Sequence, residues 1–230
     1  MLDLIWLLPT FPALGFLSLV LTSGNLPKKV VAVIGAGSIG LSFLVAALCA
    51  MEFLNSGADH FVKETWTWMA VGSFTPGFTF YLDGLSTVMM LVITGVGFLI
   101  HVYATGYMAD DPSYSRFFSY MNLFVAAMLM LVLGDNLVVL YLGWEGVGLC
   151  SYLLIGFWYT NPANGYAARK AFVVTRVGDT SMAIGLFLLF AHFGTLNIQD
   201  LMHAAETEWA VGDQLPAIAA LLLLGGAVGK

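Results

Sequence analysis

The sequence has 230 residues, of which 60% are hydrophobic and 10% are charged, and its formal net charge is -6. Soluble domains carry about 25% charged residues, so this composition and a mean hydropathy of +0.89 indicate an integral membrane protein. Its acids outnumber its bases, which excludes nucleic acid as a partner because such binding needs a basic surface. Cys49 and Cys150 both lie in apolar runs without metal-site, redox or disulfide spacing, and we interpret both as small core residues.

Apolar windows of about 20 residues, the length of a membrane-spanning helix, occur seven times. They cover residues 2–23, 29–51, 83–108, 114–133, 136–159, 166–193 and 215–230. The sequence therefore predicts an all-α polytopic membrane protein with about seven transmembrane helices in a single domain, 1–230. The chain ends inside the seventh run without a polar exit, so we expect the N-terminal part of a longer protein, truncated in its seventh helix.

Two connections carry structure of their own. Aromatic and β-branched residues surround a Pro/Gly turn between residues 55 and 82, which predicts a short extracytoplasmic hairpin near 60–81. The stretch 197–213 is typical of a short amphipathic helix that lies along the membrane surface. Neither connection suggests chemistry.

Basic residues fix the expected orientation, because Lys and Arg in short loops stay on the cytoplasmic side. Five of them fall in one set of connections and only Lys63 falls in the other; the five are Lys28, Lys29, Arg116, Arg169 and Lys170. We therefore expect the N-terminus outside.

A glycine pattern in the second segment imitates a cofactor motif. Gly35, Gly37 and Gly40 match the spacing of a dinucleotide-binding fingerprint. No soluble strand–helix–strand unit surrounds them, and small residues in a membrane helix commonly allow close helix packing. A nicotinamide or flavin site is the weakest of the alternatives.

Glu145 is the only ionisable residue between Asp135 and Arg169, in the middle of an apolar run. An ionised group there costs about 2.5–3.5 kcal/mol on insertion scales, so such residues are functional by default. Lys230 also has no opposite charge within reach on its own helix. Each must therefore pair across helices, meet water in a cavity or become neutral, and the glycines near both favour a cavity; these are Gly143, Gly146, Gly148, Gly225, Gly226 and Gly229.

Three further titratable residues lie inside predicted segments. Arg176 and Asp179 are three apart on one helix and share a face, so they form either a self-neutralising local pair or part of a functional site. His101 has a pKa range suited to proton handling, although a satisfied interface histidine is the commoner case.

Three motifs in order resemble the subunit L family of respiratory NADH:quinone oxidoreductase, complex I. They are GWEGVGLCSYLLIGFWY at 143–159, HVYATGYM at 101–108 and KAFVVTRVGD at 170–179. The resemblance covers the whole chain and implies an antiporter-like bundle in which Glu145 is the acid of the fifth helix and Lys230 the lysine of a discontinuous seventh. It also implies that Arg176 and Asp179 lie near a neighbouring pump subunit.

The resemblance further implies a multi-pass proton-translocating subunit of the bacterial inner membrane, driven by quinone reduction elsewhere in the complex. Such a subunit has no redox centre and binds no cofactor itself; NADH, FMN, iron–sulfur clusters and quinone are expected in other subunits. Its expected partners are the other membrane-arm subunits and the lipid bilayer. In the expected mechanism, Lys230 changes protonation as its pairing with Glu145 is made and broken, while Arg176, Asp179 and His101 support the transfer.

Two rival functions remain at this point. The chain is also similar to the large subunits of Mrp-type sodium/proton antiporters and to membrane-bound hydrogenase subunits, which share the glutamate helix. A structural scaffold whose charges only pair helices is the other possibility, and it predicts that neutralising Glu145 and Lys230 together preserves function.

Overall fold

The computed structural model describes residues 1–22, 24–72, 74–210 and 212–230. The other three positions, including residue 23, at which the first predicted segment ends, lie outside the described residues. The elements in chain order are η1 (Leu2–Leu4), α1 (Leu7–Leu21), α2 (Lys28–Ser56), β1 (Phe61–Thr67), β2 (Gly77–Leu82), α3 (Gly84–Tyr107), α4 (Tyr114–Leu133), α5 (Leu137–Ile155), α6 (Pro162–Phe193), α7 (Ile198–Glu208) and α8 (Gln214–Gly229).

The predicted membrane spans are confirmed as helices. Among the described residues, six are long and apolar enough to cross a bilayer: the run Leu2–Leu21 and helices α2 to α6. Helix α8 is also apolar but has 16 residues. At about 1.5 Å per residue, the 32 residues of α6 exceed a hydrocarbon core about 30 Å thick, so this helix extends beyond it.

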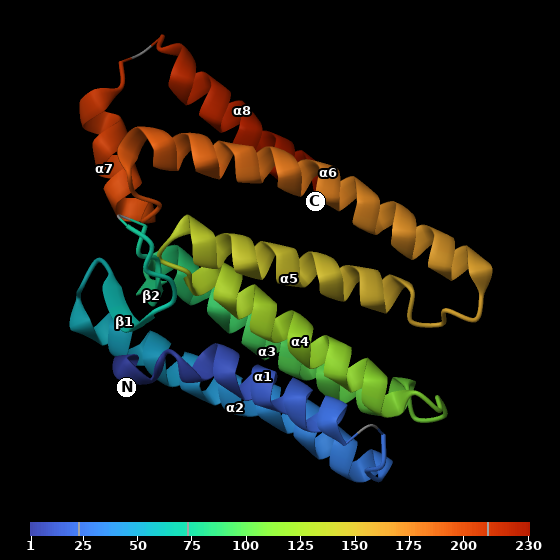
Figure 1. The fold of residues 1–230 in the computed structure, drawn as a ribbon. Helices are drawn as coiled ribbons and strands as arrows, with labels where there is room; N and C mark the ends of the chain where they lie inside the picture. The colour runs from blue at the N-terminus through green and yellow to red at the C-terminus, as the bar shows by residue number, and fades with distance from the viewer. Residues whose placement is uncertain (23, 73, 211) are drawn as a thin grey trace.

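The helices form a layered bundle (Figure 1). Helix α1 packs on α2 and α4, α5 packs on α4 and α6, and α8 lies along α6. The strands β1 and β2 pair antiparallel, which confirms the predicted hairpin. The hairpin and α7 gather at one end of the bundle, where the N-terminus also lies, and the turns α1–α2, α3–α4 and α5–α6 lie at the other end (Figure 1).

Local signals explain where the helices begin. Asp83 and Ser86 form a reciprocal capping box at the start of α3, and the Asn136 side chain accepts from the Val139 amide at 2.9 Å to start α5. Asn161 caps α6 and Pro162 occupies its first turn. Because of this cap, α6 begins four residues before the predicted start at 166.

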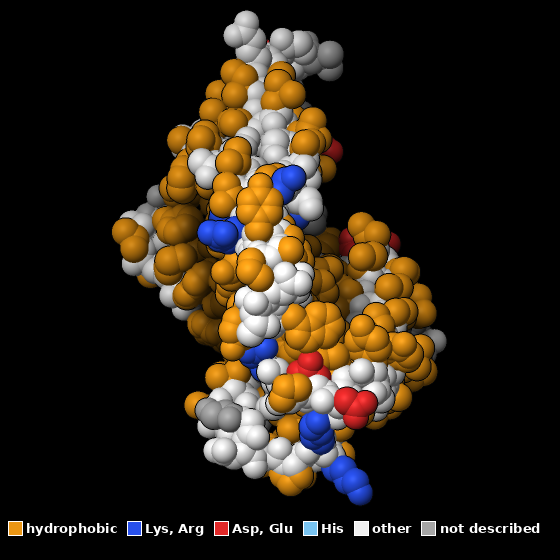
Figure 2. Space-filling model, turned by 90° about the vertical axis from the view of Figure 1, so that its right-hand side faces the viewer, with side chains coloured by type: hydrophobic (Ala, Val, Ile, Leu, Met, Phe, Trp, Pro, Cys, Tyr) orange, Lys and Arg blue, Asp and Glu red, His pale blue; other side chains and the backbone are white. Residues whose placement is uncertain are grey.

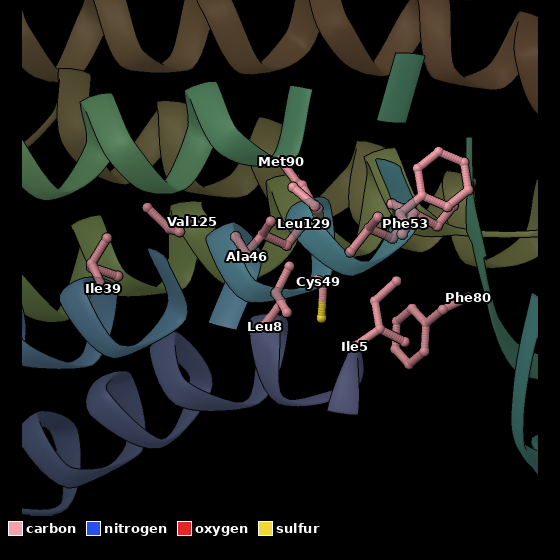
Figure 3. Packing of buried hydrophobic residues seen from close by; sticks show 13 residues of the cluster. Ile5, Leu8, Ile39, Ala46, Cys49, Phe53, Phe80, Met90, Val125 and Leu129 are labelled. Carbon is pink, nitrogen blue, oxygen red and sulfur yellow. The ribbon is translucent and has the colours of Figure 1, made fainter. Parts of the chain in front are cut away.

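The largest core joins the first four long helices to the hairpin. Ile5, Leu8, Cys49 and Phe80 are among its buried side chains, and Figure 3 shows residues from α1, α2 and β2 meeting there. Cys150 is also buried and free, so the interpretation of both cysteines as small core residues is confirmed.

The glycines of the cofactor-like pattern are part of a continuous helix. All three lie within α2, where a Cβ at Gly35 would stand 2.5 Å from the Phe118 ring and one at Gly40 would stand 3.0 Å from Phe98. A dinucleotide fingerprint needs a strand followed by a turn before its helix. The cofactor alternative is therefore wrong, and two of the three glycines instead let helices approach.

The turn between α4 and α5 is fastened to the hairpin and to α7. The Asp135 amide donates to the Thr79 carbonyl at 3.1 Å, and the Asp135 carbonyl accepts from the Ile198 amide at 3.1 Å. The Asp135 side chain accepts from the Asn197 amide group at 2.5 Å. The hairpin and α7 thus hold the beginning of α5 in place.

Lys and Arg side chains are distributed over the end of the bundle opposite the hairpin (Figure 2). This end carries the three turns that follow α1, α3 and α5; Lys28, Lys29 and Arg116 lie in the first turns of the helices that follow, and Arg169 and Lys170 lie seven and eight residues after the start of α6 at Pro162. The helical arrangement therefore brings five basic residues from three separate segments toward one end of the bundle.

Candidate functional site

Glu145 lies in the middle of α5 and faces α6. Its carboxylate forms an ion pair with the guanidinium of Arg176, and 25% of its side chain is exposed. A second nitrogen of the same guanidinium lies 3.4 Å from the Glu145 carbonyl oxygen. The acid and its backbone therefore both engage one arginine, and the pair joins α5 to α6.

Arg176 also pairs with the acid on its own helix. One of its terminal nitrogens lies 3.5 Å from Oδ2 of Asp179, and its guanidinium stands 4.4 Å from the centre of the Phe172 ring. The predicted local pair between Arg176 and Asp179 is thus present, but the arginine is shared with Glu145. Two carboxylates compete for one cation.

Asp179 is the most deeply buried of these groups, with 2% of its side chain exposed. Its Oδ1 accepts from the indole N–H of Trp144 at 2.6 Å, and its backbone carbonyl accepts from the Tyr141 hydroxyl at 3.3 Å. A buried carboxylate needs such partners because desolvation penalises its charge. Trp144 and Tyr141 of α5 supply these polar contacts, which the sequence analysis did not predict. The one indication in the sequence was that Trp144, whose indole carries an N–H donor, is the residue next to Glu145.

Lys230, at the end of α8, does not pair with Glu145 in this structure. Its ammonium donates to the backbone carbonyl of Trp144 and lies 5.1 Å from the centre of the Trp144 ring. The expected Glu145–Lys230 pair is therefore replaced by Glu145–Arg176. The lysine nevertheless lies beside the same stretch of α5.

Gly148 is the point at which the two cations come together. A Cβ at this position would stand 2.7 Å from Nζ of Lys230 and 3.2 Å from a terminal nitrogen of Arg176. Any larger residue would displace one of them, so the missing side chain is what admits both to one side of α5.

The other glycines near the charges do not open a cavity in the way expected. A Cβ at Gly143 would stand 2.5 Å from the backbone nitrogen of Leu131, and one at Gly178 would stand 2.8 Å from Cα of Gly229. These glycines bring α4 against α5 and α6 against α8. Close packing, rather than water-filled space, is their role, and α5 stays continuous from Leu137 to Ile155.

His101 lies apart from this cluster. It is fully buried on α3, its Nδ1 is 2.7 Å from the Gly97 carbonyl, and its ring centre is 6.1 Å from that of Phe118. Within the described ranges its Nε2 has no hydrogen-bond partner. These contacts of His101 are with Gly97 and Phe118 and not with the charge cluster, and the same described residues contain no group of three metal-ligating side chains.

Two family models match this chain. One, described as the N-terminus of chain 5 of NADH-ubiquinone oxidoreductase (complex I), matches residues 68–118. The other, described as the transmembrane region of NADH:quinone oxidoreductase and Mrp antiporters, matches residues 134–230 and so contains the entire charge cluster. The chain belongs to this antiporter-like family of membrane subunits.

Relatives within the family carry the name NADH-quinone oxidoreductase subunit L. The chain is 53% identical over 219 residues to that of Escherichia coli (strain K12), covering 95% of this chain and 36% of the relative. It is 56% identical over 222 residues to that of Pseudomonas aeruginosa, covering 96% and 36%. The chain thus spans about a third of the length of these relatives, and the family resemblance expected from its motifs is confirmed.

Solved structures show the same fold. A chain of the Mrp complex from Dietzia sp. DQ12-45-1b superposes with a TM-score of 0.76 at 24% identity, covering 96% of this chain and 23% of that one. A chain of an archaeal membrane-bound sulfane sulfur reductase superposes with a TM-score of 0.81 at 16% identity, covering 97% and 44%. The antiporter-like bundle is therefore the fold of the described residues.

Proposed function

We propose that this chain is part of a proton-translocating membrane subunit of NADH:quinone oxidoreductase, in which Glu145 and Lys230 transfer protons and Arg176 and Asp179 control their charges. The observation that carries the proposal is the shared arginine: Glu145 and Asp179 both pair with Arg176. Lys230 and Arg176 also both lie against Gly148. A cluster with two acids and two bases can change its net charge in single steps, as a proton carrier must.

The free energy of breaking the Glu145–Arg176 pair is similar in size to the free energy needed to move a proton across the membrane. Moving one elementary charge against about 180 mV costs about 4 kcal/mol. Removing one partner from a fully buried ion pair costs about 3–5 kcal/mol, and the lower end, about 3 kcal/mol, applies here because Arg176 and Glu145 are 30% and 25% exposed. Separating Glu145 from Arg176, or bringing Lys230 into the place of Arg176, therefore changes the free energy of the bound proton by a large part of what translocation needs.

The names of the subunit L relatives and the positions of the basic residues support the proposed setting. The subunit lies in the bacterial inner membrane with its N-terminus outside, packs against other membrane-arm subunits and contains no redox centre. NADH, FMN, iron–sulfur clusters and quinone belong to other subunits, and quinone reduction there drives the transfer. Residues 1–230 form a single transmembrane domain of the longer subunit.

The decisive experiment is Glu145→Gln in the complete, assembled complex in membrane vesicles. We expect NADH oxidation with a reduced number of protons moved per electron, because glutamine keeps the shape but takes up no proton. Glu206→Gln, on the exposed surface of α7, is the matched control and should leave the ratio unchanged. An unchanged ratio in Glu145→Gln would refute the proposed role.

An Mrp-type sodium/proton antiporter is the second candidate, favoured by the structural similarity to the Dietzia complex. The same vesicles separate the two functions. If proton movement required sodium and continued without NADH oxidation, the antiporter reading would replace the one proposed here.

A further inference from the structure

A pocket of about 740 Å³ lies at the basic end of the bundle, between the α1–α2 turn and the beginning of α4. Its apolar wall residues include Leu19, Leu26 and Val31, and its polar wall residues include Lys28, Ser115 and Arg116. A pocket lined by both kinds of residue, at the ends of membrane-length helices, suits a molecule that is itself half apolar and half charged.

The polar wall is rich in donors that lack acceptors. Lys28 and Arg116 supply two positive charges. The first amides of α4 have no acceptor within the helix, and no side chain caps them at Ser113. In the part of the chain that the structure describes, the Ser115 hydroxyl and Nε of Arg116 are buried without a hydrogen-bond partner. Helix N-termini and unpaired donors together favour an anion.

Both cations are held in place while donors remain free. Lys28 uses one ammonium proton on the Ala109 carbonyl, at 2.5 Å, and keeps two. Arg116 donates from one terminal nitrogen to the Phe157 carbonyl at 3.0 Å, and its guanidinium lies 4.7 Å from the centre of the Phe157 ring and 5.0 Å from that of Tyr159. These contacts orient the guanidinium in advance, so little side-chain entropy is lost when an anion arrives.

Asp111, in the α3–α4 turn, lies near the pocket, and its carboxylate already accepts two hydrogen bonds. Oδ1 of Asp111 accepts from the Ser113 amide at 2.7 Å, and Oδ2 accepts from the Trp158 indole at 2.9 Å. Hydrogen bonding to Trp158, with smaller contributions from the Ser113 amide and from Arg116 and Lys28, lowers the pKa of Asp111. The Asp111 carboxylate therefore stays charged and offsets part of the positive charge of Lys28 and Arg116. It binds the backbone amide of Ser113 and leaves the backbone amides of Ser115 and Arg116 available to a ligand.

We propose that this pocket binds an anionic phospholipid, with its phosphate between Lys28, Arg116 and the beginning of α4. Basic pockets between transmembrane helices bind anionic headgroups in this way. The apolar wall accounts for a lipid rather than free phosphate. The excess positive charge accounts for an anionic rather than a zwitterionic lipid, since the described residues that line the pocket include no acid to receive a choline or ethanolamine group.

The test uses the complete protein with its native partner subunits in nanodiscs that contain phosphatidylglycerol and phosphatidylcholine in equal amounts. Lipids that remain bound after detergent extraction are counted by native mass spectrometry. The unaltered protein should retain phosphatidylglycerol selectively. Lys28→Gln should lower its affinity by about tenfold, the effect of losing one charge-assisted hydrogen bond, and Lys28→Gln with Arg116→Gln should abolish the selectivity.

Lys29→Gln is the matched control, because Lys29 is the next residue, is equally charged and exposed, and is not part of the pocket lining. It should retain the lipid as the unaltered protein does. Equal loss in Lys29→Gln, or equal retention of both lipids, would overturn the proposal. Displacement of the lipid by millimolar inorganic phosphate would also overturn it and would assign the pocket to free phosphate.

Discussion

The indole N–H of Trp144 donates to Oδ1 of Asp179 at 2.6 Å, so the residue next to Glu145 holds the acid that competes with Glu145 for Arg176. The aromatic ring on α5 is therefore part of the charge network, and it can be tested separately from the ion pairs.

Trp144→Phe removes this hydrogen bond and keeps most of the apolar surface. We expect a loss of about 1–3 kcal/mol in stability, because the buried carboxylate of Asp179 loses the N–H that donates to its Oδ1. The loss should be smaller when Asp179 is already Asn, since a neutral amide is less costly to leave unpaired. The measurement is a double-mutant cycle of thermal unfolding, with exposed Trp66→Phe as control; an equal loss in both backgrounds would contradict the direct contact.

Arg176→Gln leaves two carboxylates without their cation. The expected destabilisation is at most about 3 kcal/mol, the lower part of the range for breaking a buried pair, because Glu145 and Arg176 are 25% and 30% exposed. Adding Glu145→Gln should restore part of the stability, because one uncompensated charge disappears. Additive effects of the two substitutions in a stability cycle would mean that the pair is not energetically coupled.

Gly178→Ala tests the contact between α6 and α8. A Cβ there would stand 2.8 Å from Cα of Gly229 and 3.0 Å from the Gly225 carbonyl, so the helices must separate at a cost of about 1–3 kcal/mol. Gly165→Ala is the control on the same helix, because a Cβ at Gly165 meets nothing within 4 Å. The measurement is the midpoint of thermal unfolding of the two variants. Similar midpoints for Gly178→Ala and Gly165→Ala would argue against the close contact between α6 and α8.

Asp135 predicts a pH dependence at the hairpin end of the bundle. Burial raises the pKa of this carboxyl above 3.8, and Asp200 and Glu64 add to the rise, while the hydrogen bond from Asn197 opposes it. Because the folded state binds the proton more tightly than the unfolded state, stability falls as pH rises from about 3.8 through the raised pKa. Asp135→Asn should remove this part of the dependence, measured as the difference between the two unfolding curves across that range.

The apolar pattern predicted the helices well and their rotation poorly. Each of the predicted segments contains a helix because a bilayer offers the backbone no other partners, and the Pro/Gly turn predicted the hairpin. The choice of Arg176 over Lys230 as partner of Glu145 depends on how α5 and α6 are rotated about their axes. In a helix that is apolar on every side, hydrophobicity does not fix that rotation, so the apolar pattern gave no basis for preferring Arg176 over the expected partner, Lys230.

The glycine interpretation failed for a related reason. Gly143 and Gly148 lie on the same helix, but one meets the backbone at Leu131 of α4 and the other meets Lys230 and Arg176. The sequence alone does not distinguish a glycine that admits a neighbouring backbone from one that admits a charged side chain. Only the relative positions of the neighbouring helices separate these two uses.

Helices α4 and α5 are tied together at both ends. At one end the three-residue turn at 134–136 joins them, and at the other Arg116 holds the Phe157 carbonyl and Asp111 holds the Trp158 indole. Between these ends, Gly143 admits the backbone at Leu131. We therefore expect α4 and α5 to move together as one unit, with Glu145 held in a fixed position on it. Separation of Glu145 from Arg176 then requires movement of α6 or of the Arg176 side chain. A spectroscopic label on α6 should therefore detect this movement, and a label on α5 should show no change.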